Sequence, residues 1–203
     1  MGRFNNPVLK HLPNAITVTN MVLGLSVIFL VIGDQGRAAV NGCCLLILLG
    51  AVLDYVDGRL ARYLQAASDF GKQMDSFADL VTFGLAPVAL LWSLEPAGTG
   101  APAFLLLAVY PLAGAFRLAR YNTGDYRDYF LGLPITLAGA GLAVYILVYE
   151  NFLRVHKVPV LNVISVIILL VLSLLMVSNV KVPRRLSLGG MLNHHHFFSL
   201  RMK

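Results

Sequence analysis

Two pairs of aspartates lie where apolar stretches of the sequence end or begin. Asp54 and Asp57 follow one apolar run, and Asp75 and Asp79 precede the next. Side chains three or four positions apart share one face of a helix, so each pair can present both carboxylates in the same direction. A carboxylate at the end of a membrane helix is costly, and its presence there is by default a functional hypothesis.

Four carboxylates that face one another repel unless cations lie between them. Hard divalent ions such as Mg²⁺ prefer oxygen ligands, and two metal ions about 4 Å apart recur in enzymes that carry out displacement at phosphorus. Gly58 and Gly71 lie beside the carboxylates, where a missing side chain lets a ligand approach the backbone. Arg62 lies four residues after Gly58 and suits bidentate phosphate binding. The pattern indicates a metal-dependent site for a substrate that contains a pyrophosphate.

The elements that must position these residues are membrane helices. The chain is 58% hydrophobic and only 13% charged, whereas soluble domains are about half apolar and a quarter charged. Disordered and collagen-like classes are excluded on the same ground. Six apolar stretches predict six transmembrane helices in an all-α protein: 12–33, 38–53, 80–92, 96–116, 131–149 and 158–180. The second and third are shorter than the roughly 20 residues a span needs, so we expect their helices to continue through the aspartates toward water.

The distribution of Lys and Arg predicts the orientation of these helices. Alternate loops differ strongly in positive charge, which accumulates on the cytoplasmic side of membrane proteins. One side receives Arg3, Lys10, Arg59, Arg62, Lys72, Arg117, Arg120, Arg127, Lys181, Arg184, Arg185, Arg201 and Lys203, and the other receives Arg37, Arg154 and Lys157. We therefore expect a multi-pass protein of the cell membrane with both termini and the aspartates on the cytoplasmic side. The net charge of +6 does not indicate nucleic-acid binding, because the basic residues form no basic helix or stripe.

The sequence predicts one domain over 1–203, with 1–11 as an interfacial N-terminus, for which a short helix is one reading, and 181–203 as a cytoplasmic tail. The tail contains the tract His194, His195 and His196. Such a tract can bind metal adventitiously or be a plain tail, and the residues leave both readings open. Asp69 stands outside the spacing of the other aspartates and predicts a helix cap rather than a ligand.

The spacing Asp54-x2-Asp57-Gly58-x2-Ala61-Arg62-x8-Gly71-x3-Asp75-x3-Asp79 resembles, at every defined position, the signature of the CDP-alcohol phosphotransferase family. Further segments are similar to the branch of that family that accepts serine: Pro13-Asn14-x2-Thr17-x2-Asn20, the block 116–122, and Gly132-Leu133-Pro134-Ile135. The resemblance implies six transmembrane helices, a homodimer, and displacement of CMP from a CDP-linked alcohol by a second alcohol.

The resemblance also implies roles for single residues. Asp54 and Asp75 are expected to bridge two divalent ions, Mg²⁺ or Mn²⁺, while Asp57 completes the first site and Asp79 the second. Asp79 is also the expected general base for the attacking hydroxyl, because a hydroxyl is a poor nucleophile at neutral pH. Positions that match contacts to the CDP group are Thr17, Asn20, Gly58, Arg62, Ser68 and Gly71.

The serine-accepting branch implies CDP-diacylglycerol and L-serine as substrates. Arg117 and Arg120 are three positions apart, so on a continued helix they point the same way and either hold the serine carboxylate or act as positive-inside anchors. A sister enzyme that uses glycerol 3-phosphate or an inositol phosphate is an alternative, although a phosphorylated acceptor should require more basic residues. A divalent-cation transporter is a third hypothesis, disfavoured because the aspartates gather toward one face.

Overall fold

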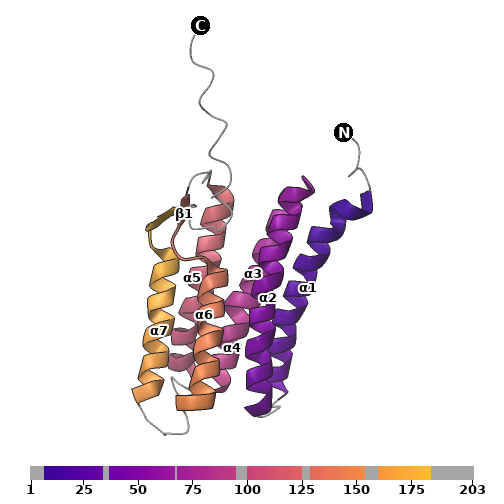
Figure 1. The fold of residues 1–203 in the computed structure, drawn as a ribbon. Coiled ribbons are helices and arrows are strands. Elements are labelled where there is room, and N and C mark those ends of the chain that lie inside the picture. The colour runs from indigo at the N-terminus through magenta and orange to yellow at the C-terminus, as the bar shows by residue number, and fades with distance from the viewer. Residues whose placement is uncertain are drawn as a thin grey trace.

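The chain folds into one bundle of helices. The structure, a computed structural model, describes residues 7–33, 37–66, 68–94, 100–124, 129–153 and 160–183. Its elements are α1 (Pro7–Ile32), α2 (Arg37–Tyr63), α3 (Asp69–Asp79), the π-helix η1 (Leu80–Leu85), α4 (Ala86–Ser93), α5 (Ala101–Thr123), β1 (Tyr129–Leu131), α6 (Ile135–Val148), the π-helix η2 (Tyr149–Leu153), α7 (Val160–Val177) and β2 (Lys181–Pro183). Figure 1 shows the helices side by side, with α1 and α2 on one side and α5, α6 and α7 on the other. The expectation of an all-α membrane fold is confirmed.

Helix length and composition identify an integral membrane protein. In the described part of the chain, four helical stretches are long and apolar enough to cross a membrane: His11–Ile32, Ala39–Tyr63, Asp69–Ser93 and Ala101–Thr123. The shorter apolar helices Ile135–Asn151 and Val163–Val177 complete the same bundle. Large apolar side chains such as Phe29 and Leu174 face outward, where lipid covers them. The count of six spans stays a prediction, because two of these helices are short.

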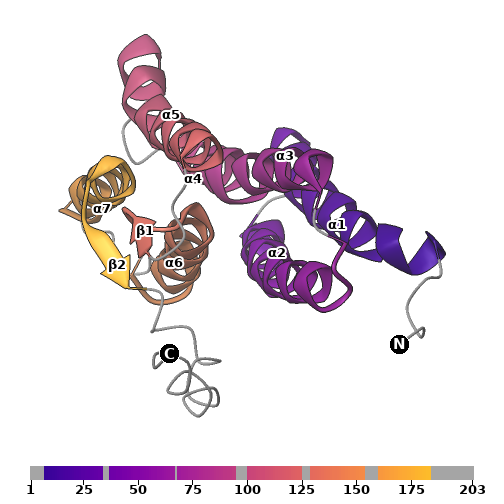
Figure 2. The same ribbon diagram turned by 90° about the horizontal axis from the view of Figure 1, so that it is seen from above.

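The two stretches that looked too short do continue through the aspartates. The helix α2 runs to Tyr63, beyond Asp54 and Asp57, and α3 begins at Asp69, before Asp75. Together α3, η1 and α4 make one continuous rod, which packs against α1, α2, α5 and α6. Figure 2 shows this rod between α1 and α2 on one side and α5 and α6 on the other. The rod is therefore the element through which the two halves of the bundle meet.

Glycines let neighbouring helices approach this rod at backbone distance. A Cβ at Gly24 of α1 would lie 2.6 Å from Oγ1 and 2.7 Å from Cα of Thr82. A Cβ at Gly139 of α6 would lie 2.6 Å from Cβ of Phe83, a fully buried side chain. Small residues of this kind are typical of helix contacts in membranes, where close packing replaces the hydrophobic effect as the driving force. These contacts at Thr82 and Phe83 hold the rod in place about one helical turn after Asp79.

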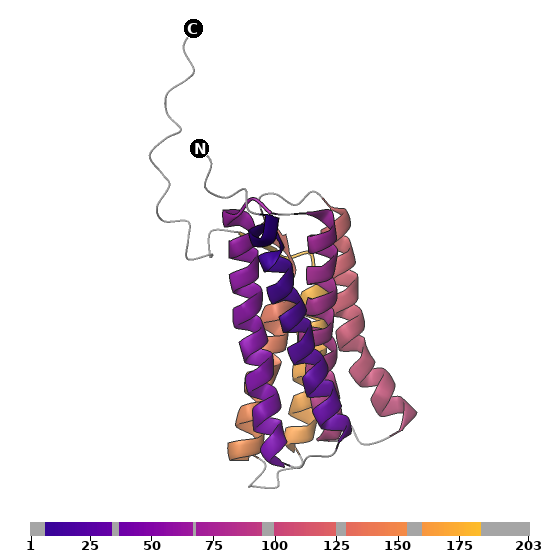
Figure 3. The same ribbon diagram turned by 90° about the vertical axis from the view of Figure 1, so that its right-hand side faces the viewer.

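The helix α5 bends away from the bundle in its first half. It contains Pro111, which removes one helical hydrogen bond and is a common cause of kinks. Figures 2 and 3 show the beginning of α5 leaning outward. Phe104 and Leu105 on this half are exposed by 61% and 66%. The second half of α5, which carries Arg117 and Arg120, stays against the rod and α7.

A short strand pair was not anticipated by the sequence. The strands β1 and β2 pair antiparallel, with Phe130 opposite Val182, and they join the connection after α5 to the segment after α7. At the other end of the chain, α1 begins at Pro7 and continues without a break through Pro13, so an interfacial role for 1–11 stays a prediction. Residues 1–6 and 184–203, with His194, His195 and His196, lie outside the described residues.

Candidate active site

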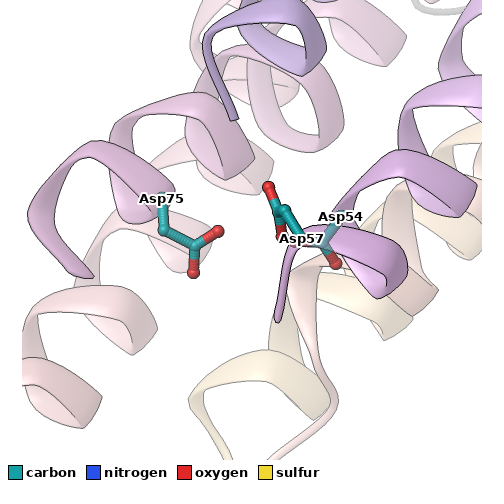
Figure 4. A group of neighbouring side chains, drawn as sticks. All are labelled: Asp54, Asp57 and Asp75. Atoms are coloured by element: carbon teal, nitrogen blue, oxygen red, sulfur yellow. The ribbon is translucent and has the colours of Figure 1, made fainter. Parts of the chain in front are cut away.

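Carboxylates from two helices meet at one point of the bundle. Asp54 and Asp57 of α2 and Asp75 of α3 each offer one carboxylate oxygen, and these oxygens lie within 4.8 Å of one another. Figure 4 shows Asp75 reaching across from its helix toward Asp54 and Asp57. Asp57 is almost fully buried, and the other two are half-buried. A cluster of this kind offers the hard oxygen ligands that divalent ions prefer.

Asp79 lies one helical turn beyond Asp75, at the last residue of α3 before the π-helix η1 begins. Its side chain is 8% exposed, and its Oδ1 has no hydrogen-bond partner among the described residues. The carboxylate interacts electrostatically with Asp54, Asp75 and Arg117. A buried carboxylate oxygen without a partner is costly, which points to a ligand at this position. Turns of π-helix frequently occur at functional sites.

Two threonines hold the aspartates of α2. Thr17 of α1 donates its hydroxyl hydrogen to Oδ2 of Asp57 at 2.8 Å, with the carbonyl oxygen of Pro13 as a second acceptor at 3.1 Å. Thr136 of α6 donates to Oδ2 of Asp54 at 3.2 Å. Thr17 was expected at the CDP group, and the structure places it against a candidate metal ligand. Thr136 was missed, and its only signal in the sequence is its position directly after the segment 132–135.

The turn between α2 and α3 sets the distance between the two aspartate pairs. The amide of Ala66 donates to the carbonyl of Ala61 at 3.0 Å, and the amide of Gln65 donates to the carbonyl of Arg62 at 3.3 Å. This is a Schellman arrangement, in which Gln65 takes the left-handed position with φ of 51°. Ser68 then caps α3 by accepting from the amide of Gly71 at 3.0 Å. The cap is therefore Ser68, and Asp69, expected to be the cap, lies in the first turn of the helix.

The residues expected at the CDP group line the same end of the bundle. A Cβ at Gly71 would lie 3.0 Å from Oδ1 of Asn14 and 3.1 Å from Oγ of Ser68, so these groups form one close cluster. Asn14 was not singled out as a site residue, although it stands in the segment 13–20 that carries the resemblance. A Cβ at Gly58 would meet nothing within 4 Å, which leaves space beside Asp57. Arg62 is exposed in the last turn of α2.

Asn20 lies deeper than the other candidates. Its side chain is 1% exposed, and both polar atoms of its amide have no hydrogen-bond partner among the described residues. A Cβ at Gly50 would lie 2.7 Å from Oδ1 of Asn20, and Gly50 is one turn before Asp54 on the same helix. The side-chain amide of Asn20 therefore lies about one helical turn from the carboxylates, toward the interior of the bundle. Its backbone carbonyl accepts from Oγ1 of Thr82 at 2.9 Å.

Arg117 and Arg120 have different partners, although their spacing predicts that they point the same way. Arg117 is 6% exposed, interacts with Asp79, and keeps its Nε without a partner among the described residues. Arg120 turns toward α7, where it donates to the carbonyl oxygens of Val177 and Ser178, both at 3.1 Å, and to Oδ1 of Asn179 at 3.0 Å. The structure brings Arg117, and not Arg120, to the carboxylates.

A polar contact between α3 and α5 fixes Arg117 relative to the aspartates. The side-chain amide of Asn122 donates to Oγ of Ser76 at 2.8 Å, and Nζ of Lys72 donates to the backbone carbonyl of Asn122 at 3.3 Å. Ser76 is the neighbour of Asp75 in the chain. These bonds hold the end of α5 against the helix that carries Asp75 and Asp79.

Comparison with known proteins agrees with this geometry. The family model for CDP-alcohol phosphatidyltransferase matches residues 10–184. A Bacillus subtilis protein named CDP-diacylglycerol–serine O-phosphatidyltransferase is 35% identical over 86% of this chain and 91% of its own length. Proteins of the same name from Helicobacter pylori and Methanocaldococcus jannaschii are each 33% identical, over 88% and 83% of this chain and 73% and 72% of their own lengths. Because the family model spans most of the chain, including every aspartate of the cluster, the chain belongs to the CDP-alcohol phosphatidyltransferase family.

Proposed function

We propose that this protein is an enzyme that transfers the phosphatidyl group of CDP-diacylglycerol to L-serine and releases CMP. The observation that carries the proposal is the placement of Asp54, Asp57 and Asp75 around one point, with Asp79 and Arg117 buried beside it. The names of the relatives support the same substrates. The family match favours a transferase over a divalent-cation transporter.

The carboxylates fit a divalent cation site. Their oxygens lie close enough to share ions, and the buried Oδ1 of Asp79, which has no hydrogen-bond partner among the described residues, is positioned to accept a ligand. We propose that Asp54 and Asp75 each contact two ions, Mg²⁺ or Mn²⁺, with Asp57 completing one ligand set and Asp79 the other. Divalent ions at this point would neutralise charge on the phosphoryl oxygens and on the departing CMP.

Asp79 is suited to accept the proton of the attacking alcohol. The serine hydroxyl oxygen forms a bond to the phosphorus that carries diacylglycerol, and the bond from that phosphorus to the bridging oxygen of CMP breaks. The hydroxyl proton passes to the carboxylate of Asp79, whose Oδ1 is free of other bonds within the described part of the chain. A base within hydrogen-bond reach is required because the neutral hydroxyl is a weak nucleophile.

Arg117 is suited to hold the carboxylate of serine. Its guanidinium is buried next to Asp79, so a zwitterion bound between them would place its carboxylate on Arg117 and its hydroxyl near Asp79. An Arg–carboxylate pair is planar and bidentate, which orients the ligand as well as binding it. Arg120 has no part in this proposed role, because its guanidinium donates hydrogen bonds to the end of α7.

The CDP group is proposed to bind at the open end of α2 and α3. The space at Gly58 and the start of α3 at Ser68 and Gly71 support this position, because helix N-termini favour phosphate. The exposed guanidinium of Arg62 adds a bidentate donor. Thr17 would contribute indirectly, through its hydrogen bond to Asp57. Asn20 would contribute through its buried side-chain amide, which has no hydrogen-bond partner among the described residues.

The orientation and assembly of the protein are part of the proposal. The excess of Lys and Arg on one side supports a cytoplasmic site and cytoplasmic termini in the cell membrane. The outer faces of the helices expose large apolar side chains to the bilayer. The acyl chains of CDP-diacylglycerol would therefore stay in the bilayer against these faces while the CDP group enters the site. A homodimer is proposed on family resemblance.

An acceptor panel tests the proposed function. Purified protein with CDP-diacylglycerol and Mg²⁺ is given L-serine, glycerol 3-phosphate or an inositol phosphate, and CMP and lipid products are measured. We expect CMP and phosphatidylserine with serine only. Product with a phosphorylated acceptor and none with serine would instead assign the chain to a sister activity of the family.

A further inference from the structure

Asp54 is held from a part of the chain that the family signature does not include. The hydroxyl of Thr136, in the first turn of α6, donates to Oδ2 of Asp54 at 3.2 Å across 82 residues of sequence. A hydrogen bond on one carboxylate oxygen fixes the plane of the group. The other oxygen is then available for a cation in a defined direction.

The start of α6 is fixed by its contacts with the end of α7. The amide of Gly132 donates to the carbonyl of Val180, and the amide of Leu133 donates to the carbonyl of Leu175, both at 3.0 Å. Gly132 has a φ of 67°, and a Cβ there would overlap the carbonyl oxygen of Met176. Only glycine meets both requirements without strain. The backbone just before Thr136 is thus seated against α7.

The end of α7 is fixed in turn from α5. Arg120 donates to Val177, Ser178 and Asn179, and its guanidinium lies 5.8 Å from the centre of the Phe116 ring. Cations at a helix C-terminus interact favourably with its unpaired carbonyl groups. A continuous series of contacts therefore runs from α5 through α7 to the start of α6 and to Asp54.

We propose that Thr136 is a positioning residue of the transfer reaction, which holds one oxygen of Asp54 and leaves the other for a divalent cation. The inference rests on the proposed function, because it requires that Asp54 binds such a cation. Hydrogen bonds to metal-binding side chains set their orientation, and their loss costs about 10- to 100-fold in metal affinity or activity.

Mn²⁺ binding to the purified full chain in detergent tests the proposal. The free Mn²⁺ signal in electron paramagnetic resonance gives the dissociation constant without any turnover. We expect Thr136→Val to raise this constant about 10- to 100-fold, and Thr136→Ser, which keeps the hydroxyl, to restore it. Thr19→Val is the matched control, because in the described part of the chain the Thr19 hydroxyl donates only to the carbonyl of Ala15 in its own helix.

Activity measurements separate positioning from a general loss of structure. With Thr136→Val, CMP release should recover as Mn²⁺ is raised, and the KM for serine at saturating Mn²⁺ should equal that of the unaltered chain. Thermal unfolding checks that the variant is folded, and Thr136→Ala removes the same hydroxyl if valine is not accommodated. A loss that no Mn²⁺ concentration corrects would overturn the proposal.

Two results distinguish the role of Thr136 from the proposed function. If the unaltered chain binds Mn²⁺ and makes phosphatidylserine while Thr136→Val has the same Mn²⁺ affinity, the role of Thr136 is wrong and the proposed function stands. If the unaltered chain neither binds Mn²⁺ nor releases CMP with serine, the proposed function fails and the role of Thr136 fails with it.

Discussion

The hydroxyl of Thr17 donates to Oδ2 of Asp57 at 2.8 Å and so joins α1 to α2 across 40 residues of sequence. Both side chains are nearly excluded from solvent, at 5% and 3% exposure. The bond is charge-assisted, and such bonds are stronger than those between neutral groups. Asp57 therefore has a fixed orientation before any ligand binds.

Removal of the Thr17 hydroxyl should weaken metal binding. A hydrogen bond to a charged group contributes about 1.5–3 kcal/mol, so Thr17→Val should raise the Mg²⁺ concentration for half-maximal CMP release by about 10- to 100-fold. Thr17→Ser should stay near the unaltered value. An unchanged Mg²⁺ requirement in Thr17→Val would mean that the Thr17 hydroxyl does not position Asp57 for a metal ion.

Replacement of Arg117 should affect serine selectively. Arg117→Ala removes the cation proposed to hold the serine carboxylate, so the KM for serine should rise by about 10- to 100-fold, from the loss of a bond of about 1.5–3 kcal/mol. The KM for CDP-diacylglycerol should change little. Steady-state kinetics with each substrate varied in turn measures both constants, and equal changes in the two would contradict a specific acceptor role.

Replacement of Arg120 should affect stability instead. Arg120→Ala removes three hydrogen bonds to the segment 177–179, and the expected loss is about 1–3 kcal/mol of unfolding free energy. Thermal unfolding in detergent should show a lower midpoint, while the serine KM of the folded fraction stays near that of the unaltered chain. A serine KM that rises as far as in Arg117→Ala would return Arg120 to the acceptor site.

Alanine substitutions at Gly58 and Gly42 of α2 test whether the space beside Gly58 is used by the substrate. A Cβ at Gly58 or at Gly42 meets nothing within 4 Å, and alanine is favoured over glycine in a helix by about 1 kcal/mol. Both variants should unfold at or above the temperature of the unaltered chain. Only Gly58→Ala should raise the KM for CDP-diacylglycerol, because its methyl group enters the space proposed for the CDP group. Equal activity in the two variants would remove Gly58 from the binding site.

Chelation should abolish activity, because the clustered carboxylates repel one another without bound cations. Excess EDTA is expected to stop CMP release, and added Mg²⁺ or Mn²⁺ is expected to restore it. Asp54→Asn should not be restored at any Mn²⁺ concentration that saturates the unaltered chain. Full turnover in excess chelator would contradict the two-metal proposal.

Local features of the site could be predicted from the sequence. The spacing of Asp54, Asp57, Asp75 and Asp79 on two helices predicts a meeting point, because helical periodicity fixes which side chains share a face. The extension of α2 and α3 beyond their apolar stretches could also be predicted, because those stretches are shorter than a membrane span, and the structure has both extensions. Periodicity and the length of an apolar stretch are properties of neighbouring residues, so both can be read without the fold.

Contacts between distant segments could not be predicted. The bond between Thr136 and Asp54 depends on where α6 begins, and the turn of Arg120 toward α7 depends on packing that no spacing encodes. The pairing of β1 with β2 involves three residues a strand, too few to give an alternating pattern. The π-helix η1 also has no mark in the sequence, because one added residue in a turn leaves the apolar composition unchanged.

The bonds from Arg120 to the end of α7 have a consequence for the order in which the protein is made. The aspartates lie within the first 79 residues and are synthesised early. The carbonyl groups that accept from Arg120 and from the Gly132 amide lie at 177–180 and are synthesised much later. A nascent chain that has inserted α1 to α6 therefore has its acidic cluster without the contacts that seat Thr136. We expect the site to reach its final geometry only when the last helix has entered the membrane.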